Sequence, residues 1–115
     1  QMTAKTTGAE AHVHIDEGYP VTINDVQLTK KMLPTMERVA GKDKVSISPL
    51  VTGAEDFSFF ALEVPGLFVF LGITPEGQDA ATAPSNHSPL FYAGEEALKV
   101  GTELYVNWVV DYPEK

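Results

Sequence analysis

A short apolar run from Leu67 to Ile73 constrains the fold more than any other stretch of the sequence. It reads Leu-Phe-Val-Phe-Leu-Gly-Ile, is rich in residues that favour strands, and lies between Pro65-Gly66 and Thr74-Pro75-Glu76-Gly77. A strand without polar positions is usually buried on both faces, as in parallel sheets that helices cover. The run therefore predicts an α/β fold with a ligand site beyond the carboxyl end of this strand.

The loop after this predicted strand carries the best candidate for a metal ligand. The tripeptide Asn86-His87-Ser88 lies between Pro84 and Pro89. A single histidine in a loop is more often an ordinary surface residue. Here, however, the two prolines restrict the backbone, and rigid placement of an imidazole is what a metal ligand or a general base requires. Because the chain has no Gly-x-Ser-x-Gly elbow that would activate a serine, we interpret His87 as a metal ligand.

Composition limits the classes of protein to which the chain can belong. With 115 residues, of which 43% are hydrophobic, it can bury the core of one modest domain. The net charge of −8 and the scattered lysines and arginines argue against nucleic acid and against anionic membranes as partners. No apolar stretch approaches the ~20 residues that span a bilayer, and there is no cysteine. We therefore expect a cytoplasmic protein.

Three elements are predicted in residues 9–47. Residues 9–16 alternate between apolar and polar side chains, which predicts a half-buried strand. His12 and His14 share its polar face, but the flanking carboxylates favour a solvated face over a metal site. A helix then runs from an Asn24 or Asp25 cap to Gly41, with a kink or a restart at Pro34. A brief strand over residues 45–47 follows, and the change of pattern marks a domain boundary near residues 18–25.

Glu55 and Asp56 have two interpretations. Thr52 and Glu55 have the spacing of a capping box, which would start a short helix whose apolar face includes Phe57. Alternatively, the two adjacent carboxylates could orient a cationic group or a metal-bound histidine at the mouth of the sheet. The capping-box spacing favours the first interpretation, in which Glu55 helps to cap the short helix.

The last element is a helix that begins near Glu95 and Glu96 and ends before Pro113. Its broad apolar stripe predicts that it covers a sheet face, with Trp108 and the tyrosines in the core. Gly101 lies on that stripe, where the missing side chain would permit close approach of the strand beneath.

Taken together, the motifs resemble the C-terminal part of the M20 metallopeptidase family. The resemblance is carried by Gly53-Ala54-Glu55-Asp56-Phe57-Ser58, Val64-Pro65-Gly66 with Phe70-Leu71-Gly72, Asn86-His87-Ser88-Pro89 and Glu95-Glu96-Ala97-Leu98. The most similar branch is the amidohydrolases of N-acyl amino acids, including hippurate and indoleacetyl-amino-acid hydrolases. Gly18-Tyr19-Pro20 and Asn24-Asp25 resemble the junction at which the chain of that family leaves a small lid domain.

This resemblance implies a domain division and a set of site residues. Residues 1–23 would contain the last strand of a small α+β lid domain and the junction to the catalytic domain. Residues 24–115 would form part of the catalytic-domain sheet covered by helices. His87 would bind one of two divalent metals, zinc, manganese or similar. Asn86 and Ser88 would contact the substrate, an N-acyl amino acid or a peptide. Glu55 and Asp56 would support the site.

The resemblance also implies that the chain is a fragment. In the family, a glutamate is the general base for attack by a metal-bound water, and that glutamate and the other metal ligands lie in an N-terminal segment that this chain lacks. We therefore expect no tight metal binding and no activity from the 115 residues alone. A homodimer is possible for the parent. The alternative is a non-enzymatic α/β interaction module in which the loop around His87 has no chemical role.

Overall fold

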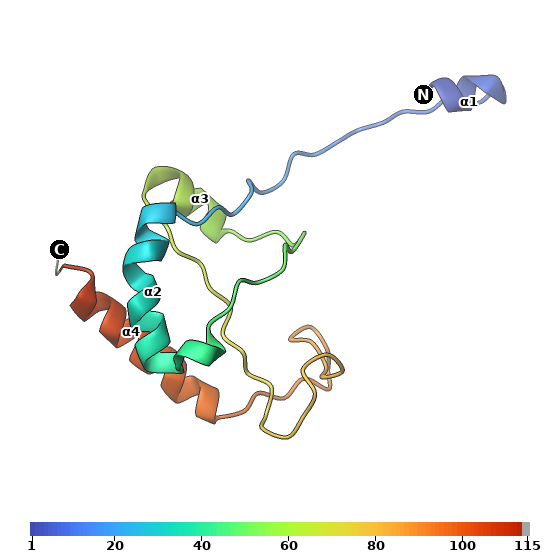
Figure 1. Cartoon of the computed structure of the whole chain (residues 1–115). Coiled ribbons are helices and arrows are strands. Elements are labelled where there is room, and N and C mark those ends of the chain that lie inside the picture. The colour runs from blue at the N-terminus through green and yellow to red at the C-terminus, as the bar shows by residue number, and fades with distance from the viewer. Residues whose placement is uncertain (114–115) are drawn as a thin grey trace.

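The computed structural model describes residues 1–113, and its regular structure consists of helices (Figure 1). They are α1 (Met2–Thr6), α2 (Val26–Ala40), the short 3-10 helix η1 (Lys42–Lys44), α3 (Phe57–Glu63) and α4 (Glu96–Asp111). No residue in the range 1–113 forms a strand or a bridge. The predicted α/β fold, with its partial sheet and its lid strand, is therefore wrong for this chain.

The reason for the error is that a strand is stable only beside a neighbour. Residues 9–16, 45–47 and 67–73 have strand-like sequences, but a sheet requires at least three strands with a shared apolar face, or a helix packed on it. None of these segments pairs with another in the described part of the chain. Burial on both faces is also wrong for the run 67–73, since the Phe70 side chain is 66% exposed.

The helix predictions succeed because their signals are local. The Asp25 carboxylate accepts a hydrogen bond from the Leu28 amide at 2.7 Å, and Gly41, with φ of 95°, follows the last residue of α2. Pro34 lies inside α2, and the helix does not restart there. The beginning of α3 differs from the prediction: Asp56 precedes it without a side-chain cap, and Thr52 makes no capping bond.

A pair of long helices, α2 and α4, forms the packed centre of the molecule (Figure 1). The buried hydrophobic side chains are Met32 and Met36 of α2 and Leu104 of α4. Trp108 is only half-buried and Tyr105 is 70% exposed, so neither belongs to the buried core in which the sequence placed Trp108 and the tyrosines. The helical stripe of α4 thus contacts a helix and one extended segment, since there is no sheet for it to cover in residues 1–113.

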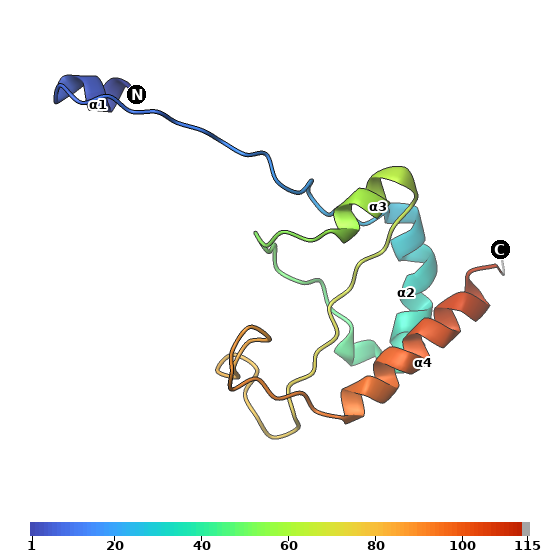
Figure 2. The same ribbon diagram turned by 180° about the vertical axis from the view of Figure 1, so that it is seen from behind.

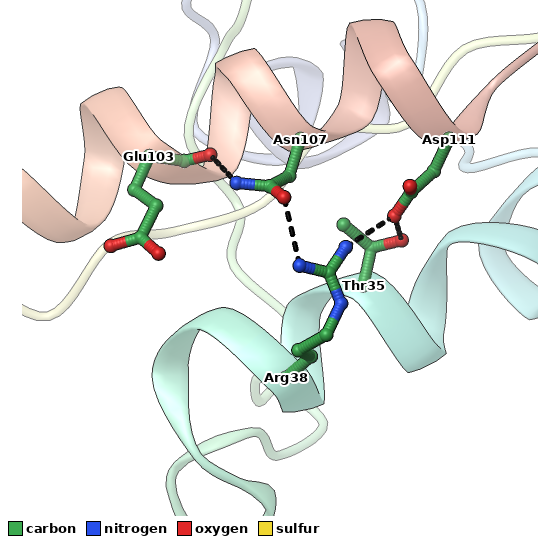
Figure 3. Close-up of polar contacts among 5 residues, drawn as sticks. All are labelled: Thr35, Arg38, Glu103, Asn107 and Asp111. Carbon is green, nitrogen blue, oxygen red and sulfur yellow. Dashed lines mark hydrogen bonds and ion pairs between the residues drawn. The ribbon is translucent and has the colours of Figure 1, made fainter.

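A polar network joins the same two helices beside their apolar contact (Figure 3). The Arg38 guanidinium donates to Asn107 Oδ1 at 2.8 Å and to Asp111 Oδ2 at 2.6 Å. Thr35, which is buried, donates its hydroxyl to the same Asp111 oxygen at 2.6 Å. The Asn107 amide also donates to the backbone oxygen of Glu103 at 2.7 Å. Because these bonds require matching positions on both helices, they fix the register of α2 against α4.

The extended run 67–73 is tied to the helices at both ends. At its beginning, the Asn24 side chain bonds both backbone groups of Phe68, and the Asp25 amide donates to the Gly66 oxygen at 2.8 Å. At its end, the Gly94 amide donates to the Ile73 oxygen at 2.8 Å. Between them, a Cβ added at Gly101 would lie 3.0 Å from Leu71 Cδ2, which confirms the predicted close approach of α4 to this run.

The chain as a whole is expanded. Its radius of gyration is 20.0 Å, whereas a compact domain of this length has about 13 Å. Its accessible surface is 9970 Å², against about 6,200 Å² for a compact protein of 12.5 kDa. The helices therefore cover only part of the apolar surface that the sequence provides.

The N-terminal part of the chain, with α1 at its far end, projects away from α2, α3 and α4 (Figures 1 and 2). The ring of Tyr19 makes an edge contact with Phe59 of α3, with centroids 5.5 Å apart. His12 and His14 lie before this point, are exposed, and face Glu10 and Asp16 respectively. The division into residues 1–23 and 24–115 stays a prediction.

Replacing Gly66 with alanine should destabilise the chain. The new Cβ would lie 3.0 Å from Phe57 Cζ and 3.1 Å from Ala61 Cβ, so the run must move away from α3. We expect the free energy of unfolding to fall by about 1–3 kcal/mol in urea titrations. Gly72→Ala is the matched control, because no atom lies within 4 Å of the position that its Cβ would take, and it should change stability by less than about 0.5 kcal/mol. Equal effects of the two variants would contradict the packing of Gly66.

Arg38→Met should weaken the contact between α2 and α4. The substitution keeps the apolar stem but removes the bonds to Asn107 and Asp111. Because the Arg38 side chain is 54% exposed, we expect a loss of only about 1 kcal/mol in the same titrations. Lys30→Met, at an exposed position of the same helix, is the control and should have almost no effect. A larger loss for Lys30→Met would contradict the role of the network.

Candidate functional site

The loop around His87 is built from two consecutive turns. The Ser88 amide donates to the Ser85 oxygen at 2.9 Å, and the Phe91 amide donates to the Ser88 oxygen at 3.0 Å. The hydroxyl of Ser88 also accepts from the Leu90 amide at 3.1 Å. Local hydrogen bonds thus support the prolines in defining the backbone on either side of His87.

The side chains of this loop face solvent. His87 and Asn86 are exposed, and Ser88 is half-buried. The His87 backbone amide makes a long contact of 3.4 Å with Ser85 Oγ, but its imidazole has no partner among residues 1–113. An exposed imidazole is available to a ligand, although exposure alone does not make it one.

Glu55 and Asp56 lie directly before α3. Glu55 Oε1 accepts a hydrogen bond from the Phe57 amide at 3.3 Å, so this carboxylate contacts the first turn of the helix. Ser58, which is fully buried, donates its hydroxyl to the Glu55 backbone oxygen at 2.6 Å. The Asp56 side chain is exposed. Glu55 therefore has a structural role even though its predicted partner, Thr52, is not involved.

The His87 loop and the acidic pair lie at opposite ends of the extended run 67–73 (Figures 1 and 2). Gly66, before the run, contacts Phe57 of α3, whereas Ile73, at its end, bonds Gly94 next to the loop. No contact joins His87 to Glu55 or Asp56 in the part of the chain that the structure describes. The predicted site residues are thus not brought together, and their roles stay predictions.

The described residues do not by themselves fit a metal ion. No group of three or more His, Cys, Asp or Glu side chains gathers anywhere in residues 1–113. Catalytic zinc is normally held by three protein ligands. His87 could therefore supply one ligand of a metal centre but not the whole of it.

Sequence reasoning missed the role of Asn24. The sequence predicts it only as an alternative helix cap, whereas in the structure Asp25 caps α2 and Asn24 bonds the backbone of Phe68. The available signal was the pair Asn24-Asp25 itself, because only one residue can occupy the cap position and the other is left for a different partner.

Comparison with known proteins gives consistent matches over nearly the whole chain. The sequence profile of Peptidase family M20/M25/M40 matches residues 3–111. An IAA-amino acid hydrolase ILR1-like 2 of Arabidopsis thaliana is 33% identical over 96 residues, which cover 84% of this chain and 21% of that protein. Thermostable carboxypeptidase 2 of Saccharolobus solfataricus is 30% identical over 101 residues, which cover 88% of this chain and 24% of that protein.

A third relative, from Bacillus subtilis, has a name that describes an amidohydrolase (YhaA). It is 27% identical over 105 residues, which cover 91% of this chain and 26% of that protein. The chain thus spans about a quarter or less of the length of these curated relatives. No solved structure gives a significant match. None of the helices in residues 1–113 is long and apolar enough to cross a membrane.

Proposed function

Because the chain belongs to peptidase family M20, we propose that it is the C-terminal part of a metal-dependent amidohydrolase that cleaves the amide bond of N-acyl amino acids. The observation that carries this proposal is the match of the family profile to residues 3–111, together with relatives that are named as hydrolases and carboxypeptidases. These relatives are about four times longer or more, so the active enzyme draws most of its residues from outside these 115.

His87 is the metal ligand that this chain contributes to the enzyme. Its imidazole is exposed and unpartnered among the described residues, and two turns define the backbone beside it. A divalent metal, when bound, polarises the amide carbonyl and activates a water molecule. Because the described residues complete no metal centre, the other ligands and the general base come from the rest of the enzyme.

The neighbours of His87 contact the substrate in this proposal. Asn86 is exposed and offers an amide that can both donate and accept a hydrogen bond. The Ser88 hydroxyl accepts from the Leu90 amide, which leaves its proton for a substrate oxygen. Glu55 and Asp56 support the site from the start of α3. The substrate class, an N-acyl amino acid or a small peptide, is supported by the names of the relatives. A homodimeric parent remains part of the proposal.

The proposal predicts different results for the full-length enzyme and for this chain. In the full-length enzyme, His87→Ala should lower kcat/KM by about 100-fold or more and reduce the bound metal measured by elemental analysis. The control is His14→Ala, because His14 is exposed, lies in the projecting segment and bonds Asp16. The 115-residue chain alone should retain no stoichiometric zinc after dialysis.

Two results would contradict the proposal. Unchanged metal content and activity in the His87→Ala enzyme would show that His87 is not a metal ligand. Stoichiometric zinc in the dialysed 115-residue chain would show that the ligands lie within it, contrary to the requirement for residues from elsewhere.

A further inference from the structure

The loop that carries the proposed metal ligand begins and ends at the same point of the structure. It covers residues 74–93, between the extended run and the beginning of α4 (Figure 1). The backbone amide of Gly94 donates to the Ile73 oxygen at 2.8 Å, so the two ends of the loop are joined directly. Gly94 is buried, and its own oxygen accepts from the Ala97 amide at 3.2 Å in the first turn of α4. The run, the loop and the helix therefore meet at Gly94.

A second contact lies one helical turn further along α4. Gly101 follows Ala97 by four residues, so the two positions lie on the same face of the helix. A Cβ added at Gly101 would lie 3.0 Å from Leu71 Cδ2, which is closer than the optimal carbon–carbon separation of about 3.5–4.0 Å. The missing side chain thus lets α4 lie directly against the run. Leu71 lies two residues before Ile73, so this contact is close to the bond at Gly94.

These two contacts, between Gly94 and Ile73 and between Gly101 and Leu71, form what we call the loop base. The hydrogen bonds inside the loop are local: among the described residues they join positions at most four apart. Such bonds shape single turns but do not orient a loop against a helix. The position of His87 relative to α4 therefore depends on the loop base.

We propose that Gly101 is a positioning residue for His87. This role depends on the proposed function, in which the His87 imidazole binds a divalent metal. A side chain at position 101 would push α4 away from Leu71. Because the bond from Gly94 to Ile73 joins the same helix to the same run, it would lengthen or break, and the ends of the loop would separate. A metal centre then loses affinity, since metal–ligand distances vary by only about 0.2 Å.

Gly101→Val in the full-length enzyme tests this role. The valine methyl groups would press on Leu71, and we expect the dissociation constant for zinc to rise at least about tenfold in competition with a chromophoric chelator. A merely structural role would lower the free energy of unfolding but leave the zinc affinity of the folded enzyme unchanged. Circular dichroism checks that the variant is folded. If it is not, Gly101→Ala takes its place, with an expected rise of at least about threefold.

The matched control is Thr102→Val. Thr102 adjoins Gly101 in α4, is exposed, and has a side chain of the same shape as valine. This variant therefore introduces the same residue into the same turn of the helix without pressing on Leu71. Its zinc dissociation constant should differ from that of the natural enzyme by less than about twofold.

A second substitution tests whether the effect passes through Leu71. Leu71→Ala removes as many carbon atoms as Gly101→Val adds, and substitutions that conserve volume are the best tolerated in packed regions. The double variant should therefore allow α4 to return to the run. We expect its zinc dissociation constant to lie within about threefold of the natural value.

The outcomes separate this role from the proposed function. Loss of zinc in His87→Ala with unchanged affinity in Gly101→Val would overturn the positioning role and leave the proposed function in place. Equal weakening by Gly101→Val and by the double variant would also overturn the role, because the effect would not pass through Leu71. Full retention of zinc by His87→Ala would overturn the proposed function and, with it, the role of Gly101.

Discussion

The hydrogen bonds between Asn24 and Phe68 connect two parts of this structure that lie far apart in the sequence. The Asn24 amide accepts from the Phe68 N–H at 2.7 Å and donates to the Phe68 oxygen at 2.8 Å, which is the pattern that a neighbouring strand would otherwise supply. Since Asp25 caps α2 directly afterwards, the apolar run is held against the beginning of that helix. The same run also packs at Gly66 on α3 and at Leu71 beside Gly101.

Local signals predicted α2, α3 and α4 but not α1, and missing neighbours explain the failure of the sheet. The Asp25 cap, Gly41 and the apolar spacing of α2 and α4 act within a few residues, so the sequence contains all that those helices need. The run 67–73 has the composition of a buried strand, but burial requires other segments on both sides. No such segments lie beside it among residues 1–113. Its strand-like sequence therefore suits an environment that the described residues do not provide.

The candidate site follows the same logic. The proline-flanked loop predicted a defined backbone, and two turns around Ser88 provide it. The sequence identifies His87 as a candidate ligand. It does not show that His87 and Glu55 lie at opposite ends of the run 67–73, as they do in the structure (Figure 1). A metal centre needs ligands from several segments, and the described residues gather no such group. The profile of peptidase family M20 matches residues 3–111, and the role of His87 within that family stays a proposal.

Asn24 bonds the side of the run that carries the backbone groups of Phe68, whereas the backbone groups of Leu67 and Val69 on the opposite side make no hydrogen bond among residues 1–113. Amide hydrogen exchange, followed by NMR, tests this directly. The Phe68 amide should exchange about tenfold or more slowly than the amides of Leu67 and Val69, and Asn24→Ala should abolish the difference. Equal exchange of Phe68 and Val69 in the natural chain would contradict the account.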